Sequence, residues 1–286
     1  MPKNKPIHKV FKIPKSILLT GKVLQFFSTD LAASFVLKLF RTPYKFPRPG
    51  REKKMYEQSE KEMLFIPELN KRIQVYKCGS GKKKVLLVHG WAGRGTQLSK
   101  MTQELVENDF QVISFDATAH GESDGKTSAM PEFITSILTI EKKYTPFDFA
   151  IGHSLGGMAL LQAVKSGFQV KKIVVIGVAD SILDICKQFV ERLGLQERVA
   201  YSLKNKMDKI LQTDSEILSA SVAAKEIKIP SLVIHDTQDT DVPLVWAENV
   251  FKHLAKGEML VTEGLGHRRI ISDDKVIRRI LDYFNT

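Results

Sequence analysis

From residue 84 to the end of the 286-residue chain, short apolar runs alternate with longer stretches of helical periodicity. The apolar runs cover residues 85–88, 112–115, 147–151, 173–176, 232–234 and 259–261. The helical stretches cover residues 97–108, 131–143, 155–165, 244–254 and 273–284. Continuous apolar strands that alternate with helices are typical of a parallel sheet buried on both faces. The pattern therefore predicts an α/β fold, with a mostly parallel sheet and helices on both of its faces.

Residues 181–228 interrupt this alternation. The interval contains helical material with charged faces and no strand-like run. It follows one predicted strand and precedes the next, so it can lie over the carboxyl ends of the strands, where ligands bind in open α/β sheets. We interpret it as a small helical cap.

The first 54 residues differ in composition from the rest of the chain. They hold thirteen Lys and Arg against two acids, whereas residues 55–286 are formally neutral. The basic residues are Lys3, Lys5, Lys9, Lys12, Lys15, Lys22, Lys38, Arg41, Lys45, Arg48, Arg51, Lys53 and Lys54. Apolar residues between positions 16 and 40 follow the spacing of one amphipathic helix, and three prolines at 43–49 predict an extended linker. We expect this segment to precede one main domain at 55–286, which opens with a β-hairpin at 63–66 and 72–76.

The basic segment does not read as a membrane span or a secretory signal. Lys22, Asp30 and Lys38 interrupt its apolar residues at intervals far shorter than the ~20 residues that a span needs. The segment either packs on the rest of the protein, which we favour, or makes a peripheral contact with an anionic membrane. Cys78 and Cys186 are too few for a disulfide framework, so we expect a cytoplasmic protein. The neutral body argues against nucleic acid as a partner, and the sequence does not indicate the oligomeric state.

A G-x-S-x-G motif runs from Gly152 to Gly156, directly after one predicted strand and before a predicted helix. The sharp turn between them exposes the serine hydroxyl at the helix N-terminus, where backbone N–H groups favour a developing negative charge. The glycines are needed because side chains at these positions would collide. Ser154 is therefore the candidate nucleophile.

A serine hydroxyl needs a base within hydrogen-bond reach, and an acid that orients the base. Among seven histidines, His267 lies in a loop just past the last predicted strand, where the order of serine, acid and histidine requires the base. Three aspartates follow the strand at 232–234. Asp236 can close the turn and Asp241 can cap the next helix, which favours Asp239 as the acid.

Acyl chemistry also needs N–H donors for an oxyanion. Leu155 follows the nucleophile and supplies the first. Trp91, in the glycine-containing loop after the strand at 85–88, is best placed to supply the second. No metal-ligand spacing and no cofactor motif stands out, so we expect a cofactor-free site.

These motifs occur in the order seen in α/β hydrolases, which the chain resembles from about residue 84 to its end. They are HGW at 89–91, FDATAHGES at 115–123, the elbow at 152–156, HDTQD at 235–239 with VP at 242–243, and GLGH at 264–267. A glycine usually stands in the family where this chain has Ala119. The resemblance is to serine esterases, lipases and peptidase-like members with a small helical cap. It implies hydrolysis of an ester, thioester or amide of a small acyl substrate through an acyl-enzyme. The alternative is a ligand-binding protein on a hydrolase scaffold, which the complete set of three residues disfavours.

Overall fold

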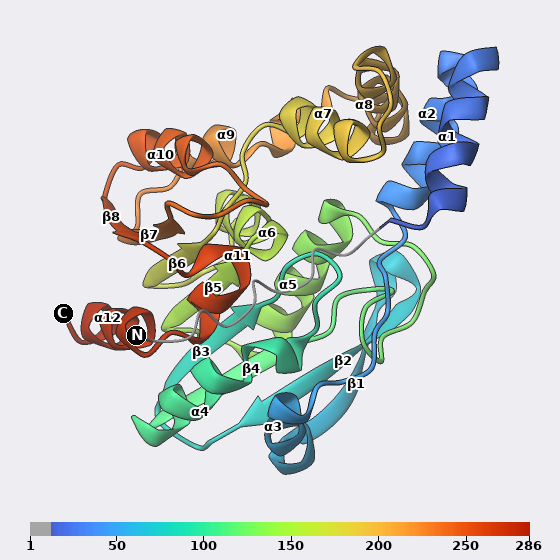
Figure 1. Cartoon of the computed structure of the whole chain (residues 1–286). Coiled ribbons are helices and arrows are strands. Elements are labelled where there is room, and N and C mark those ends of the chain that lie inside the picture. Colours follow the sequence, from blue (N-terminus) through green and yellow to red (C-terminus); the bar gives the residue numbers. More distant parts are fainter. Residues whose placement is uncertain (1–12) are drawn as a thin grey trace, which may run out of the picture. The chain divides into compact units, whose positions relative to one another are not determined.

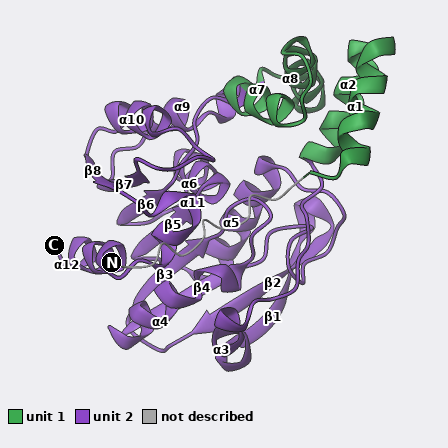
Figure 2. Cartoon of the chain, viewed as in Figure 1, with its two compact units in different colours: residues 1–40, 183–214 green, residues 41–182, 215–286 purple. Residues whose placement is uncertain are grey.

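The computed structural model describes residues 13–286, and the chain divides into two compact units (Figure 2). Unit 1 consists of Met1–Phe40 and Leu183–Asp214, and unit 2 of Arg41–Ile182 and Ser215–Thr286. The boundaries expected from the sequence were residue 54, between the basic segment and the main domain, and 181–228 for the cap. Lys3, Lys5, Lys9, Lys12 and His8 lie outside the described residues.

Unit 2 is built on one sheet of eight strands (Figure 1). In spatial order the strands are β1 (Glu60–Ile66), β2 (Lys71–Cys78), β4 (Phe110–Phe115), β3 (Lys83–Val88), β5 (Phe149–His153), β6 (Lys172–Ile176), β7 (Ser231–Asp236) and β8 (Gly257–Thr262). The first two strands pair antiparallel, as the predicted hairpin requires, and β2 also runs antiparallel to β4. The other five pairings are parallel. The predicted fold class is confirmed.

Helices cover both faces of this sheet, so its central strands are buried throughout. On one face, α4 (Ser99–Glu107) and α12 (Asp274–Asn285) pack on alternate strand residues such as Val85 and Val174. The intervening strand residues turn to the other face, against α6 (Leu155–Lys165) and α10 (Leu244–His253), with α5 (Met130–Tyr144) beside α6. The remaining helices of unit 2 are α3 (Lys53–Gln58), α9 (Ala220–Ala224) and α11 (Gly266–Arg269). Burial on both faces explains why the strand sequences lack polar alternation.

The N-terminal helix predicted from residue 16 to residue 40 is two helices, so the expectation of one was wrong. α1 (Lys15–Phe27) ends before Ser28 and α2 (Thr29–Phe40) begins after it. The Ser28 backbone is extended, and its hydroxyl accepts hydrogen bonds from the N–H groups of Asp30 and Leu31 at 3.2 and 3.3 Å. A serine in this position caps the helix that follows, which breaks the apolar periodicity at one residue.

In unit 1 these two helices pack on the middle of the insertion, which forms α7 (Ile182–Arg192) and α8 (Arg198–Leu211). Ala32, Ala33 and Val36 of α2 are fully buried. The rings of Phe40 and Phe189 meet edge to face with centroids 5.2 Å apart. The N-terminal helices therefore make a small helical core with the insertion. Among residues 13–286, no helix is both long and apolar enough to cross a membrane.

Candidate active site

The strand β5 leads into α6 through a sharp turn at Ser154. This residue has φ 54° and ψ −123°, a backbone conformation that side chains rarely adopt. A Cβ atom on Gly156 would overlap the carbonyl oxygens of Val88 and His89, and one on Gly152 would overlap the backbone of Gly156. The turn thus requires glycine at both positions, as the motif predicted, and it holds the Ser154 side chain at the start of α6.

The structure brings together the three side chains that the sequence singled out for the reaction. The Ser154 hydroxyl lies 3.0 Å from Nε2 of His267, and Nδ1 of His267 lies 2.7 Å from Oδ2 of Asp239. With its proton on Nδ1, the imidazole donates to Asp239 and leaves Nε2 to accept from the serine. His267 belongs to the short helix α11 rather than to the predicted loop.

The Asp239 carboxylate is buried and fixed by the backbone. Its Oδ1 accepts hydrogen bonds from the N–H groups of Asp241 and Val242, both at 2.8 Å. Burial alone would raise the pKa of Asp239, but the hydrogen bond to His267 and these backbone donors outweigh it and hold the pKa below its usual value. The group is therefore ionised at neutral pH, as an acid that orients a histidine must be.

Asp236 holds the loop that carries the histidine. It closes its own turn through the Gln238 N–H, as the sequence analysis allowed, and it also accepts from the N–H groups of Leu265 and Gly266 at 3.0 and 2.9 Å. The Thr262 hydroxyl donates to it as well, at 2.7 Å. The link to residues 265 and 266 could not be read from sequence, because it joins loops that follow different strands. The third aspartate, Asp241, does not cap α10, which begins after Pro243 without a side-chain cap.

The contribution of His153 was not predicted from the sequence. Its Nε2 lies 2.9 Å from the His267 carbonyl oxygen, so this ring donates a hydrogen bond to the backbone of the candidate base. Burial, with His267 nearby, lowers the pKa of His153 to about 3. The neutral ring supports the position of His267, and the only signal for it was its place beside Ser154 in the motif.

The loop after β3 lies directly against the turn at Ser154. A Cβ atom on Gly90 would stand 3.0 Å from the Ser154 Cβ, so the backbone of this loop approaches closely. Neither the Trp91 N–H nor the Leu155 N–H donates a hydrogen bond within residues 13–286, whereas the Ala92 N–H donates to Nε2 of His120 at 3.1 Å. Among the described residues these two N–H groups therefore have no acceptor and remain available as donors.

Two buried histidines connect the loop after β3 to the loop after β4 by hydrogen bonds. His89 bonds the Gly90 carbonyl oxygen through Nδ1 at 2.7 Å and accepts from the Ala117 N–H through Nε2 at 3.0 Å. His120 makes the matching pair of bonds to the Thr118 carbonyl oxygen and the Ala92 N–H. Burial lowers the pKa of His89 to about 4 and, with His89 beside it, that of His120 to about 3. Both rings are therefore neutral at physiological pH, and their hydrogen bonds hold the backbone of the loop in place.

Comparison with protein-family models finds two matches along the chain. The model described as serine aminopeptidase, S33, matches residues 79–220, and the model described as TAP-like protein matches residues 209–286. Both are models of α/β hydrolases, and together they span the sheet from β3 to β8 with Ser154, Asp239 and His267. The chain belongs to the α/β-hydrolase superfamily. It is a hydrolase of the α/β-hydrolase type.

Solved structures share the fold of this hydrolase at low sequence identity. An esterase of Exiguobacterium antarcticum is 18% identical with a TM-score of 0.62, over 79% of this chain and 100% of that one. An esterase of Pyrococcus furiosus is 16% identical with a TM-score of 0.66, over 86% and 97%. A thioesterase domain from the curacin biosynthetic pathway is 13% identical with a TM-score of 0.58, over 79% and 99%. No curated protein sequence matches the hydrolase significantly.

The hydrolase keeps a left-handed turn at Ala119, where the family usually has glycine. Ala119 has φ 63° and is buried. A non-glycine residue in this region costs roughly 1–2 kcal/mol. The departure therefore leaves the turn geometry intact at a small cost in stability.

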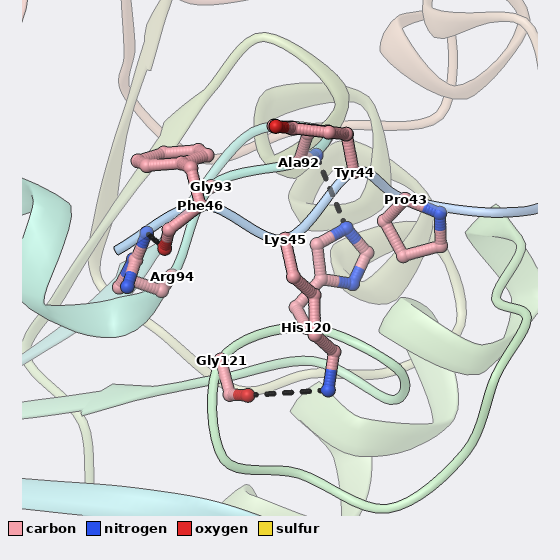
Figure 3. Close-up of a pocket in the computed structure, with 9 residues that line it drawn as sticks. All are labelled: Pro43, Tyr44, Lys45, Phe46, Ala92, Gly93, Arg94, His120 and Gly121. Atoms are coloured by element: carbon pink, nitrogen blue, oxygen red, sulfur yellow. Dashed lines mark hydrogen bonds between the residues drawn. The ribbon is translucent and has the colours of Figure 1, made fainter. Parts of the chain in front are cut away.

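The linker of the hydrolase lies against the loop after β3 and encloses a small pocket with it (Figure 3). The Arg94 guanidinium donates to the Phe46 carbonyl oxygen at 2.7 Å and lies over the Phe46 ring. Lys45 donates to the Gly121 carbonyl oxygen at 3.3 Å. The pocket is lined by Pro43, Tyr44, Lys45, Phe46, Ala92, Gly93, Arg94, His120 and Gly121. Neither Ser154 nor His267 lines it, so it is distinct from the space around the nucleophile.

The neutral histidines predict a loss of stability in mild acid. The pKa of a histidine in the unfolded chain is about 6.5, so between this pH and about 4 the unfolded state binds protons that the folded state does not. Stability is complete above this window and falls as the pH drops through it, by roughly 2 kcal/mol at pH 5 for each of His89, His120 and His153. Urea denaturation at pH 8 and pH 5 measures the difference. His120→Gln should reduce the difference, and equal stability of the wild type at both pH values would contradict the burial argument.

Proposed function

We propose that this hydrolase cleaves a carboxylic ester through an acyl-enzyme on Ser154. The observation that carries the proposal is the unbroken series of hydrogen bonds from Ser154 through His267 to Asp239, at 3.0 and 2.7 Å. A strained turn at the nucleophile, a base within reach and an ionised acid behind the base are the parts that activate a serine hydroxyl. Within residues 13–286, this is the one place where they occur together.

Acylation begins when the Ser154 oxygen attacks the substrate carbonyl carbon and its proton passes to Nε2 of His267. The carbonyl oxygen becomes an oxyanion, which the Trp91 and Leu155 N–H groups stabilise. The imidazolium is stabilised by the Asp239 carboxylate, which stays ionised. Collapse of the intermediate breaks the ester bond, and His267 protonates the departing alcohol.

Deacylation repeats these steps with water as the nucleophile. His267 takes a proton from the water molecule, the resulting oxygen attacks the acyl carbon, and the same two N–H groups hold the second oxyanion. Ser154 leaves with the proton returned by His267, and the carboxylic acid is released. The Asp236 and His153 contacts keep the histidine in one orientation through both halves of the cycle.

Esters are the first substrate class to test because two of the similar structures are esterases. A thioesterase domain and an aminopeptidase family model also match, which makes thioesters and amides the next classes. All three classes pass through the same acyl-enzyme and differ in the leaving group.

The test combines turnover with covalent labelling of the full chain. We expect hydrolysis of p-nitrophenyl esters within a series of increasing acyl length, and labelling by a fluorophosphonate at Ser154, located by peptide mass spectrometry. Parallel assays with acyl thioesters and amino-acid p-nitroanilides rank the three classes of bond. A folded protein that takes up no label and cleaves none of these substrates would contradict the proposal and favour a binding role. A label on any other serine would contradict the assignment of the nucleophile.

A further inference from the structure

We infer that unit 1 docks on an anionic membrane surface through an apolar patch on α1 and the start of α2. The patch consists of Leu19, Val23, Phe26, Phe27 and Leu31. Their exposed fractions are 63%, 47%, 84%, 74% and 52%. Leu19, Val23 and Phe26 follow the spacing of one helical face, and the rings of Phe26 and Phe27 meet edge to face with centroids 5.4 Å apart. Five large, exposed apolar side chains, two of them phenylalanines, thus lie within residues 19–31.

The packing of unit 1 leaves this patch unused. The opposite side of α1 faces the insertion, where a Cβ atom on Gly21 would stand 3.3 Å from the Leu195 side chain. Gln25, on the same side, accepts a hydrogen bond from the Gln196 N–H at 2.7 Å. The helix therefore has an inner side that stabilises unit 1 and an outer side that packing does not explain. A surface of this kind on a soluble unit indicates an interaction site.

The net positive charge of unit 1 indicates that the partner of the patch is anionic. Its 72 residues hold thirteen Lys and Arg against six Asp and Glu, while the 214 residues of unit 2 hold thirty against twenty-six. Within residues 1–40 the only acid is Asp30, and Lys206 pairs with it at 2.7 Å. Lys15 and Lys22 are exposed on α1 itself. Exposed phenylalanine and leucine beside excess positive charge match the interface of a bilayer that carries anionic headgroups.

A second copy of the chain fits the patch less well than a membrane. Two copies joined through it would bring together two units that each carry a net charge of the same sign, which opposes association. An anionic headgroup region attracts those charges, while its acyl boundary accepts the phenylalanine rings.

The test is flotation of the full chain with vesicles, which needs no turnover and so stands apart from the proposed function. Wild type should float with equimolar phosphatidylcholine and phosphatidylglycerol, should not float with phosphatidylcholine alone, and should be released by salt. The double variant Phe26→Ser, Phe27→Ser should lose about tenfold or more in partitioning, with its thermal unfolding and ester turnover unchanged.

Val23→Ser and Val245→Ser form a matched pair. Val245 lies on α10 of unit 2 and is exposed by 59%, so its replacement should leave vesicle binding unchanged, whereas Val23→Ser should weaken it. Absence of wild-type binding, or equal binding by the phenylalanine variant, would overturn the inference. So would a wild-type dimer in light scattering that the phenylalanine variant dissociates, because the patch would then be the contact between two copies.

Discussion

Ser154→Ala is expected to lower kcat for ester hydrolysis by about 10⁴-fold or more and to abolish fluorophosphonate labelling. The substitution removes the oxygen that His267 Nε2 faces at 3.0 Å and leaves the backbone of the turn unchanged, including the Ser154 N–H bond to the Ile176 carbonyl oxygen at 2.9 Å. The free energy of unfolding should therefore change little. Steady-state kinetics and urea denaturation on the same preparation separate the two effects.

Ser166→Ala is the matched control for this experiment. Ser166 is exposed at the other end of α6, so the same change there should leave kcat as it is. A Ser154→Ala protein that keeps one tenth of the wild-type rate would exclude this serine as the nucleophile.

Asp239→Asn is expected to lower kcat by about 10⁴-fold with the fold retained. The asparagine oxygen can still accept from the Asp241 and Val242 N–H groups, but an NH₂ group would replace Oδ2, 2.7 Å from Nδ1 of His267. Nδ1 must then accept, which moves the imidazole proton to Nε2, the atom that has to take the proton from Ser154. The loss should appear in kcat and in the rate of fluorophosphonate labelling alike.

Asp241→Asn gives the control within the same loop. Its carboxylate oxygen lies 3.9 Å from Nε of Arg268, and 31% of the Asp241 side chain is exposed, against 1% for Asp239. We expect nearly wild-type turnover. If instead Asp241→Asn abolished turnover and Asp239→Asn did not, the acid would have been assigned to the wrong residue.

The sheet and the turn around Ser154 could be predicted from the sequence because each depends on a local pattern. Buried strands have continuous apolar runs, and the turn at Ser154 needs glycine on both sides. The strands are parallel, so the loops that carry Ser154, Asp239 and His267 emerge at one edge of the sheet. The order of the motifs along the chain and their place after parallel strands are therefore enough to predict that the three residues meet.

One local cap and the contacts between segments far apart in sequence could not be predicted. The break at Ser28 depends on one capping hydroxyl inside an otherwise continuous periodicity. The assembly of residues 1–40 with 183–214 depends on which helix faces match, and apolar spacing alone does not reveal a partner. The bond from His153 to the His267 carbonyl oxygen joins residues 114 positions apart. The last two features follow from tertiary packing, whereas the break at Ser28 is a local cap that the apolar periodicity hides.

The contacts of the linker at residues 43–49 limit how far the chain can be shortened from its N-terminus. Besides the Arg94 bond to the Phe46 carbonyl oxygen, Arg48 donates to the Thr96 and Tyr76 hydroxyls and pairs with Glu122 at 3.2 Å. A truncated protein that starts at residue 55 would lose these contacts beside the loop that carries Trp91, although its sheet would be complete. One that starts at residue 41 would retain them. A start at residue 41 therefore preserves the linker, but it removes α1 and α2 from α7 and α8, so residues 183–214 would have to be removed with them to leave unit 2 alone.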